Sequence, residues 1–385
     1  MKLYNKQNNN TEFNPFITTG YETPKYFCDR EKETKKVISA LSNGRNVTLI
    51  SLRRMGKTGL IHHVFYEIKR NDKNSQCFYL DIFATQSLHE FVNLLGKTVI
   101  GKLDSFSESV MKNITTVFKN LRPVFSMDTQ TGETSVSLNI QKEETETGLK
   151  EIFDYLKESK KQCYIAIDEF QQITEYPEKG VEALLRSYIQ FLPNVKFIFA
   201  GSKKHIMDSI FSDSNRPFYQ STQKIGLKEI PIESYREFAI KHFKENKLTL
   251  TGDVFNYIYE KTFGHTWYIQ MLLNQLFSLK LDTLSIKVVN EIIDDLLEEE
   301  NSTYKTYCEI ITKGQFKLLR AIASEKKISE STESKFMLKY ELTAPSSVRL
   351  AIKSLIEKNL IIKDENHNYY IYDRFFSFWL EKTIK

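Results

Sequence analysis

The sequence predicts an α/β fold: a five-stranded parallel sheet covered by helices, then a helical segment and a small basic C-terminal unit. Three observations support this prediction. Up to Ile230, five short apolar runs alternate with longer helical patterns. After Ile230 the pattern is helical throughout, and residues from Ile310 onward account for the whole formal charge of +5. Near-continuous apolar runs of this kind are typical of parallel strands that are buried on both faces.

Length and composition exclude several classes of protein. A chain of 385 residues with 41% hydrophobic content is long enough for two or three compact domains. No segment approaches the roughly 20 apolar residues of a membrane span, and no leader pattern is present, so we expect a cytoplasmic protein with no membrane partner. The four cysteines are scattered and form no metal-ligand pattern, so we expect buried reduced thiols instead of zinc or disulfides.

The predicted elements follow in chain order. Residues Met1–Thr18 are rich in Asn and lack periodicity, which favours a tail or an arm laid over the next domain. The five predicted strands are Val47–Ser51, Cys77–Phe83, Cys163–Phe170, Val195–Gly201 and Lys224–Ile230. The interruption at 104–148 is interpreted as an inserted hairpin with a turn at Thr131 and Gly132. The predicted domains are therefore 19–230 for the sheet, 231–305 for a helical domain and 306–385 for the basic unit.

A phosphate-binding loop follows the first predicted strand. Its letters are SLRRMGKT, and a helix follows directly, so backbone amides at the helix N-terminus would point at a phosphate. Lys57 would reach the β- and γ-phosphates of ATP, and the hydroxyl of Thr58 would bind Mg²⁺. Ser51 replaces the usual first glycine, which it can do if its backbone angles are ordinary. The alternative interpretation of this motif is that Gly-Lys-Thr occurs in a loop by chance. The expected nucleotide-binding residues of this loop are Ser51, Leu52, Arg53, Arg54, Met55, Gly56, Lys57, Thr58 and Gly59.

Two carboxylates end the third predicted strand. Asp168 would bind Mg²⁺ through its water shell, and Glu169 would polarise the attacking water as general base. Acids at a strand end are common on protein surfaces, but their order after a phosphate-binding loop indicates a Walker A and Walker B pair. The sequence therefore predicts an ATPase that slowly converts ATP and water to ADP and phosphate.

Two further positions are candidate catalytic residues beside Glu169 and Lys57. Ser202 ends the fourth strand, where it would sense the γ-phosphate or the water, or would instead cap the next helix. Arg216 precedes the fifth strand, where it would reach a neighbouring subunit's site as an arginine finger, or would be an ordinary surface arginine.

With these motifs the chain resembles the prokaryotic STAND-type ATPases, in particular the archaeal-type ATPase family related to origin-recognition ATPases. The resemblance is seen in Tyr26–Glu31, in the loop with its double arginine, in Ile165–Phe170, in Phe199–Ser202 and in Gly264–Tyr268. It implies an AAA-like sheet, a helical lid over 231–305, and ATP turnover used as a conformational switch. It also implies that Arg30 and Glu31 lie near the adenine, and that Gly264 and His265 close over the nucleotide. Thr266 stands where the family usually has proline, and Asp29 replaces a common glycine.

The C-terminal unit has a winged-helix pattern. Thr343 is predicted to cap a helix that has Pro345 in its first turn. The inward stripe of this helix is predicted to be Val348, Ile352, Leu355 and Ile356. The outward residues, expected to face a DNA major groove, are Ser346, Ser347, Arg349 and Lys353. The aromatic cluster Phe375–Trp379 is expected to pack the last helix.

Two strands and a turn complete the predicted wing. The strands are Leu360–Lys363 and Tyr369–Tyr372, and the tip Asp364–Asn368 carries two acids that would repel phosphates. The leading hypothesis is a nucleotide-switched ATPase that acts on double-stranded DNA or on a DNA-bound complex. The alternatives are a STAND-like signalling or regulatory scaffold whose winged helix binds a protein partner, and a module that binds ATP without hydrolysing it. The oligomeric state stays open, a homo-oligomer included.

Overall fold

The computed structural model describes residues 13–103, 118–127, 134–159, 161–329, 333–342, 344–364 and 366–383. The chain divides into two compact units, Ile17–Tyr235 and Arg236–Lys385, and residues 13–16 belong to the second. Within the described ranges, none of the helices combines the length and the hydropathy that crossing a membrane requires. The lid and the winged helix fall in one unit, so separate domains at 231–305 and 306–385 stay a prediction.

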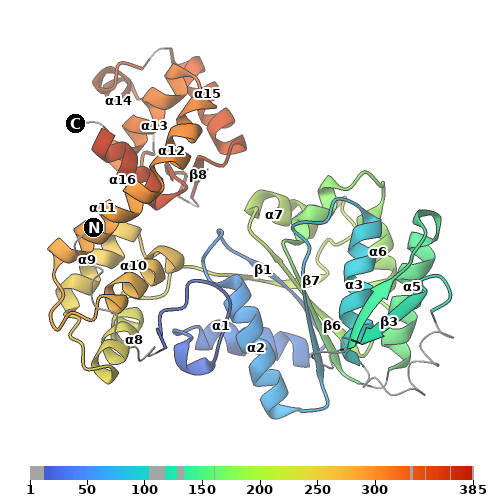
Figure 1. Cartoon of the computed structure of the whole chain (residues 1–385). Helices are drawn as coiled ribbons and strands as arrows, with labels where there is room; N and C mark the ends of the chain where they lie inside the picture. The colour runs from blue at the N-terminus through green and yellow to red at the C-terminus, as the bar shows by residue number, and fades with distance from the viewer. Residues whose placement is uncertain are drawn as a thin grey trace. The chain divides into compact units, whose positions relative to one another are not determined.

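The first unit is built on a five-stranded sheet in which every neighbouring pair of strands is parallel (Figure 1). The strand order is β2-β5-β6-β1-β7, with β1 at Asn46–Ile50, β2 at Gln76–Asp81, β5 at Cys163–Asp168, β6 at Val195–Gly201 and β7 at Thr222–Gly226. This confirms the predicted five-stranded parallel sheet. The fifth strand lies earlier than the run Lys224–Ile230 suggested, because β7 pairs with β1, and β1 ends at Ile50, opposite Gly226.

Helices cover both faces of this sheet (Figure 1). They are α1 (Glu31–Ser42), α2 (Lys57–Asn71), α3 (Leu88–Leu103), α5 (Thr145–Glu158), α6 (Val181–Ile189) and α7 (Lys204–Ser212). Side chains of α1 and α2, such as Val37 and Leu60, form one core with β1. Side chains of α3 and α5, such as Phe91 and Ile152, belong to a second core. Burial on both faces explains why the strands are almost continuously apolar.

An antiparallel hairpin lies between α3 and α5 in the sequence. Its strands are β3 (Pro123–Met127) and β4 (Thr134–Leu138). A pair of antiparallel strands therefore lies where a hairpin was predicted, while the insertion bounds 104–148 stay a prediction and the turn at Thr131 and Gly132 lies outside the described residues. Short 3₁₀ helices also occur, at Pro24–Tyr26, Lys142–Glu144 and Phe170–Glu175.

Helices make up most of the second unit. Its helices are α8 (Ile232–Glu245, which crosses the unit boundary), α9 (Gly252–Thr262), α10 (Thr266–Ser278), α11 (Ile286–Glu299), α12 (Asn301–Glu309), α13 (Lys313–Glu325), α14 (Ser334–Lys339), α15 (Pro345–Glu357) and α16 (Arg374–Thr383). The described end of the N-terminal arm packs here, not on the sheet that follows it in sequence. Phe16 is fully buried against Phe243 and Phe277, and Asn14 donates to the carbonyl of Asn274 (3.0 Å).

The C-terminal elements form a winged helix. Strands β8 (Ile361–Lys363) and β9 (Tyr369–Ile371) pair antiparallel, and Ile328 adds a bridge to Tyr369. The N-cap position of α15 is Ala344, not Thr343 as predicted, and because alanine has no polar side-chain atom, no side-chain hydrogen bond caps the helix there. Thr343 itself lies outside the described residues, as does Glu365 in the wing tip.

The last helix anchors the winged helix to the rest of its unit. Phe375, Phe376 and Phe378 are buried, as predicted for the aromatic cluster, and Trp379 donates to Asn301 (3.0 Å). The guanidinium of Arg374 lies 3.8 Å from the ring centre of Phe263, and burial lowers the pKa of Arg374 to about 10.

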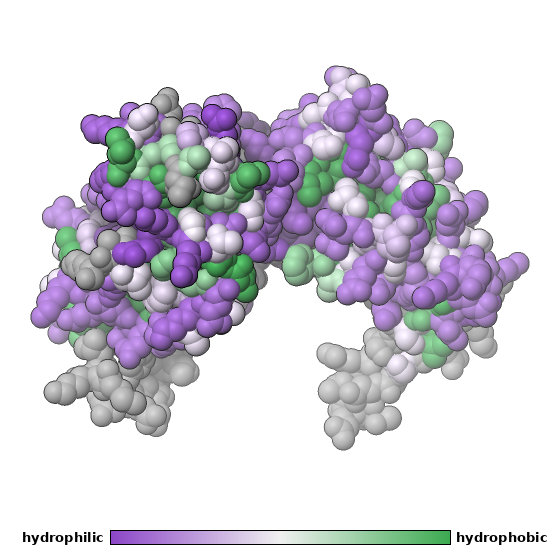
Figure 2. All heavy atoms as spheres, turned by 90° about the horizontal axis from the view of Figure 1, so that it is seen from above, coloured by the Kyte–Doolittle hydropathy of each residue, from purple (hydrophilic) through white to green (hydrophobic). Residues whose placement is uncertain are grey.

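Figure 2 shows mainly hydrophilic side chains on the visible face, with hydrophobic ones in small scattered groups.

Candidate nucleotide site

The phosphate-binding loop connects β1 to α2 and has the backbone that the motif requires. Gly56 precedes α2 with φ 89°, and Arg54 also lies in the left-handed region with φ 63°. Ser51 is not among the residues with positive φ, so serine can replace the usual glycine without backbone strain. Lys57 is 6% exposed and donates to the carbonyls of Ser51 (3.5 Å) and Leu52 (3.4 Å). The lysine thus lies folded over its own loop.

The first acid of the Walker B strand contacts the loop directly. The hydroxyl of Thr58 donates to Oδ2 of Asp168 (2.8 Å), and the hydroxyl of Tyr79 donates to the same oxygen (2.9 Å). The backbone N–H of Glu169 donates to Oδ1 (2.9 Å). Asp168 is only 3% exposed, so hydrogen bonds replace the water that a buried carboxylate loses. Burial and the charge of Asp168 raise the pKa of Tyr79.

The second acid is held by two donors. Glu169 has left-handed backbone angles, and its Oε2 accepts from the hydroxyl of Ser202 (2.8 Å) and from the side-chain amide of Gln171. Gln171 is 3% exposed, and a Cβ at Gly201 would overlap with it and with Met207. The glycine before Ser202 therefore makes room for the residue that holds Glu169.

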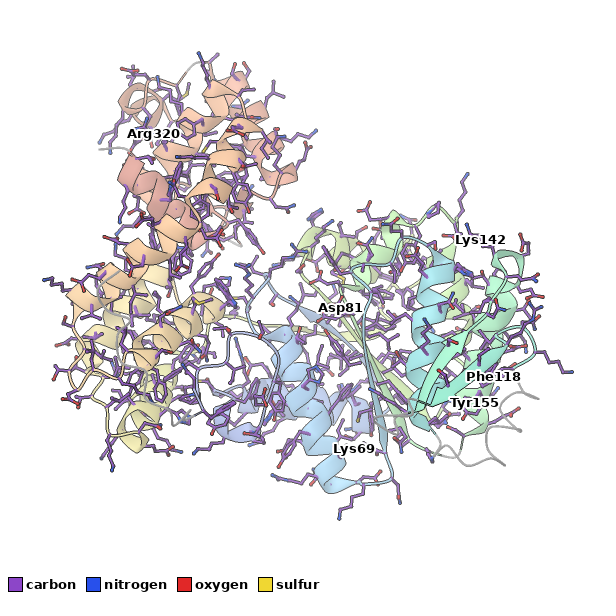
Figure 3. All side chains as sticks on the ribbon, in the orientation of Figure 1. Lys69, Asp81, Phe118, Lys142, Tyr155 and Arg320 are labelled. Atoms are coloured by element: carbon purple, nitrogen blue, oxygen red, sulfur yellow. The ribbon has the colours of Figure 1, made fainter. Side chains whose placement is uncertain are left out.

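Carboxylates at neighbouring strand ends affect the pKa values of ionisable side chains around the loop. Burial lowers the pKa of Lys57, and the carboxylates of Asp168 and Glu169 oppose that shift. Asp81, labelled in Figure 3, ends β2 opposite Asp168. Burial raises the pKa of Asp81, and the charges of Asp168 and Glu169 raise it further. Arg53 lies 5.0 Å from the ring centre of Phe83, just beyond this strand.

The segment before α1 also reaches the loop. Arg30 is 4% exposed, donates to the carbonyl of Met55 (3.3 Å) and pairs with Glu33 (3.1 Å). Asp29 and Arg30 both have positive φ, a region that glycine adopts readily and that aspartate is one of the residues to tolerate. Glu31 is exposed at the first position of α1.

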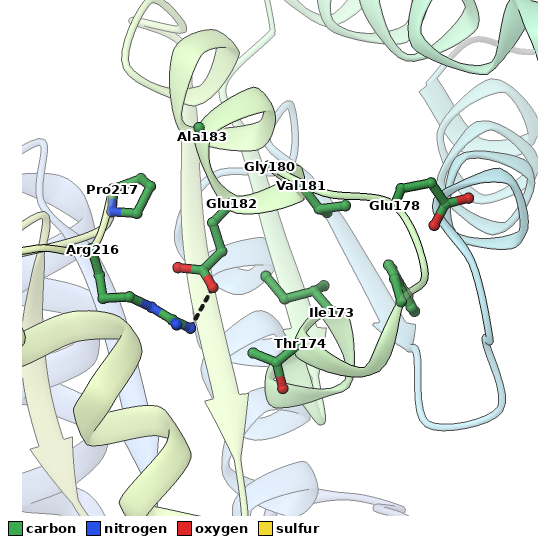
Figure 4. A pocket seen from close by; sticks show the side chains of 10 residues that line it. Ile173, Thr174, Glu178, Gly180, Val181, Glu182, Ala183, Arg216 and Pro217 are labelled. Atoms are coloured by element: carbon green, nitrogen blue, oxygen red, sulfur yellow. Dashed lines mark hydrogen bonds and ion pairs between the residues drawn. The ribbon is translucent and has the colours of Figure 1, made fainter.

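Arg216 lies apart from these residues. Its guanidinium pairs with Glu182 on α6 (2.5 Å) beside an open pocket of about 290 Å³, which no residue of the phosphate-binding loop lines (Figure 4). Nε of Arg216 and Oε2 of Glu182 are buried without a hydrogen-bond partner. Burial raises the pKa of Glu182, and Arg216 opposes the shift.

The remaining predicted site residues belong to the second unit. Gly264 and His265 form the turn before α10, so their part in the nucleotide site stays a prediction. The four residues predicted to face DNA are all exposed on α15, namely Ser346, Ser347, Arg349 and Lys353. Val348, Ile352 and Leu355 of the inward stripe are buried, whereas Ile356 is half-buried.

Two polar contacts at the site, and one away from it, were not predicted. Tyr79 lies in an apolar strand and Gln171 two residues beyond the motif, and neither belongs to a sequence pattern for this chemistry. Glu182 became a candidate only through its contact with Arg216. The one sequence signal for these contacts is the polar hydroxyl of Tyr79 within an otherwise apolar strand, which indicates a hydrogen-bonding role.

The comparisons with known proteins agree with this geometry. A family model described as "ATPase domain predominantly from Archaea" matches residues 27–272, and one described as "Probable winged helix domain" matches residues 302–382. Among curated proteins, no relative matches the chain.

Solved structures share the fold. The Walker-type ATPase PABY2304 of Pyrococcus abyssi is 18% identical, with 95% of this chain and 99% of that chain covered and a TM-score of 0.62. The ORC2 protein of Aeropyrum pernix, solved as ADPNP-ADP complexes, is 13% identical, with 97% and 99% covered and a TM-score of 0.57. Because the ATPase model spans more than half of the chain, the protein belongs to this family of ATPases found predominantly in Archaea, and it carries a C-terminal winged helix.

Proposed function

We propose that this ATPase binds ATP with Mg²⁺ at the loop Ser51–Thr58, hydrolyses it slowly, and uses the nucleotide state to control a winged helix that acts on DNA or on a DNA-bound complex. The contact between Thr58 and Asp168 supports this most directly. It joins the last residue of the loop to the first acid of the Walker B strand, with Lys57 and Glu169 as their chain neighbours.

The donor set fits magnesium. A hydroxyl and a carboxylate in hydrogen-bond contact are the hard oxygen ligands this ion takes. Among the described residues, no group of three or more His, Cys, Asp or Glu side chains could hold a metal by itself, which matches an ion that also needs phosphate oxygens and water. Thr58 would bind the ion directly, and Asp168 would hold it through water. Bound magnesium would neutralise charge on the β- and γ-phosphates.

The chain's own residues would perform the remaining steps. Lys57 would leave the carbonyls of Ser51 and Leu52 and bind the phosphates, because an ammonium group gains more from phosphate oxygens than from neutral carbonyls. Glu169 would orient the attacking water and accept its proton, held in place by Ser202. Backbone amides of the loop would bind the phosphates.

Several finer assignments belong to the same proposal. Arg30 and Glu31 would lie on the adenine side, while Gly264 and His265 would close from the lid. Arg216 would act in a neighbouring subunit of a homo-oligomer only after leaving Glu182, which now holds it. The domain bounds 19–230, 231–305 and 306–385 complete this arrangement.

DNA as the target rests on the exposed face of α15. Four polar or basic side chains point outward there, and the basic excess of the chain lies in residues 310–385. The ORC1 protein of Aeropyrum pernix, solved in complex with DNA, shares the fold at 12% identity and a TM-score of 0.52, with 93% of this chain and 94% of that chain covered. The alternative is a STAND-like scaffold whose winged helix binds a protein. It is favoured by Leu350, an apolar side chain 69% exposed on the same helix.

Labelled duplex DNA, titrated with the protein at several salt concentrations in ATP, ADP or no nucleotide, separates the two targets. We expect binding that weakens with salt and that differs between ATP and ADP. No binding even at low salt would remove DNA from the proposal. A nucleotide-dependent protein partner that is still captured after nuclease treatment would then support the scaffold.

A further inference from the structure

One oxygen of Asp168 has two donors, and only one of them belongs to a nucleotide-binding motif. Oδ2 accepts from Thr58 of the phosphate-binding loop and from Tyr79 of β2. Oδ1 accepts from the backbone of Glu169. Each carboxylate oxygen of this buried residue therefore has a hydrogen-bond partner, and among the described residues Tyr79 provides the one side-chain bond to Asp168 that comes from neither the loop nor the Walker B strand.

The sheet places Tyr79 where it can make this contact. In the register of β2 and β5, Tyr79 lies opposite Ala166, and Asp81 lies opposite Asp168. Ala166 and Asp168 are two residues apart on one strand, so their side chains point to the same face. Tyr79 and Ala166 both pack against the core under α1 and α2. The small alanine leaves room beside it, and the long phenol extends along the strand to the carboxylate.

Helix α2 holds Tyr79 from the other side. The ring of His62 lies 4.7 Å from the ring of Tyr79, centre to centre. His62 is one helical turn after Thr58, so both residues project from the same side of α2. Tyr79 is thus packed by the same helix that supplies the hydroxyl ligand proposed for magnesium.

We propose that Tyr79 is a positioning residue for the magnesium site: its hydroxyl holds the carboxylate of Asp168 in the orientation that serves Thr58 and the water shell of the ion. This inference rests on the proposed function. Without Tyr79, Asp168 would keep Thr58 as donor to Oδ2 and the backbone N–H of Glu169 as donor to Oδ1, and the second donor on Oδ2 further restrains rotation of the carboxylate. With Asp168 fixed, the hydroxyl hydrogen of Thr58 stays directed at Oδ2, and the lone pairs of the Thr58 oxygen stay available to the metal.

Tyr79→Phe removes only the hydroxyl and keeps the ring that packs against His62. Loss of such an outer partner of a metal ligand typically weakens metal affinity, here by about tenfold. We expect the Mg²⁺ concentration that half-saturates nucleotide binding to rise by that factor. Binding of the same nucleotide in EDTA should stay unchanged, because phosphate contacts to Lys57 and the loop amides do not involve Tyr79.

The measurement is a Mg²⁺ titration of the binding of a fluorescent, non-hydrolysable ATP analogue to the full chain. Tyr164→Phe is the matched control, since Tyr164 lies on the neighbouring strand β5, is also half-buried and packs against the same core. Partial unfolding of a variant lowers the signal but not the midpoint, so the comparison holds even for a destabilised variant.

An unchanged Mg²⁺ midpoint for Tyr79→Phe overturns the inference. So does an equal loss of affinity with and without Mg²⁺, which is the result expected of a purely structural tyrosine, and so does an equal shift in Tyr164→Phe. If the unsubstituted chain binds no analogue at any Mg²⁺ concentration, the proposed function itself fails and the inference with it. That outcome is recognised from the unsubstituted chain alone.

Discussion

The nucleotide site and the exposed face of α15 contain similar side chains in opposite settings. At the site, Thr58 and Tyr79 share one oxygen of Asp168, and Gln171 and Ser202 share one oxygen of Glu169. On α15, the residues predicted to bind DNA are all exposed to solvent: Ser346, Ser347, Arg349 and Lys353. Buried polar groups must satisfy one another, so their chemistry is specified by the fold. An exposed helix face is compatible with several partners, because water already satisfies its polar groups.

The two lysines in these regions illustrate the difference. Lys57 is 6% exposed, and burial lowers its pKa, so its ammonium group gains from any phosphate that replaces the loop carbonyls as its partner. Lys353 is exposed, so its attraction to a phosphate is weakened by water and by salt. For these two lysines, the predicted effect of substitution is therefore larger at the buried site than on the exposed helix.

The largest effect on ligand binding is expected for Lys57→Ala. It removes the buried cation that would bind the β- and γ-phosphates, and hydrogen bonds between charged groups contribute up to about 3 kcal/mol, so ATP affinity should fall about 100-fold. Isothermal titration with ATP and Mg²⁺ measures this loss. Lys204→Ala, an exposed lysine on α7, is the control and should bind ATP as the unsubstituted chain does. Equal affinities in Lys57→Ala and the control would contradict the site.

A smaller effect is expected when Arg349 and Lys353 are both changed to Glu. If α15 enters a DNA groove, duplex affinity at low salt should fall about tenfold, and the slope of log affinity against log salt should decrease by about 2, one for each lost phosphate contact. Fluorescence anisotropy at several salt concentrations gives both values. ATP turnover without DNA should stay the same. Duplex binding and a slope identical to those of the unsubstituted chain would show that this face does not bind DNA.

The smallest effect is expected for Gln171→Ala. It removes one of the two donors to Oε2 of Glu169, a contribution of ~1 kcal/mol, so turnover should fall about fivefold while the KM for ATP stays constant. Because Ser202 donates to the same oxygen, the combined loss in Gln171→Ala with Ser202→Ala should differ from the product of the two single losses. Independent, multiplicative losses would mean that the two donors do not act together. Steady-state phosphate release provides these values.

The sheet and the two motifs could be predicted from the sequence because their patterns are local. An apolar run predicts a buried strand, and the loop Ser51–Thr58 has a fixed spacing before its helix. Contacts between strands cannot be predicted in this way. Tyr79 reaches Asp168 because β2 lies beside β5 in the sheet. The residues of either strand do not reveal which strand will be its neighbour.

Differences at the ends of elements have the same origin. The last strand ends at Gly226 because its neighbour β1 ends there, although apolar residues such as Leu227 and Ile230 continue beyond it and are buried. The sequence predicted Phe16 only as part of a tail. The aromatic residues that it packs against, Phe243 and Phe277, lie more than two hundred residues further along the chain, so local pattern does not reveal the contact. Exposed residues of α15 were predicted correctly because helical spacing alone decides which side faces solvent.

The most direct test of the account is phosphate release and ATP binding, measured on the same preparations of the unsubstituted chain and of Glu169→Gln. The amide keeps the size of the side chain but cannot accept the proton of the attacking water, so turnover should fall about 100-fold or more while ATP affinity stays the same. Turnover that is equal in the two proteins, or absent from both while ATP still binds, would contradict the claim that Glu169 makes this site an ATPase.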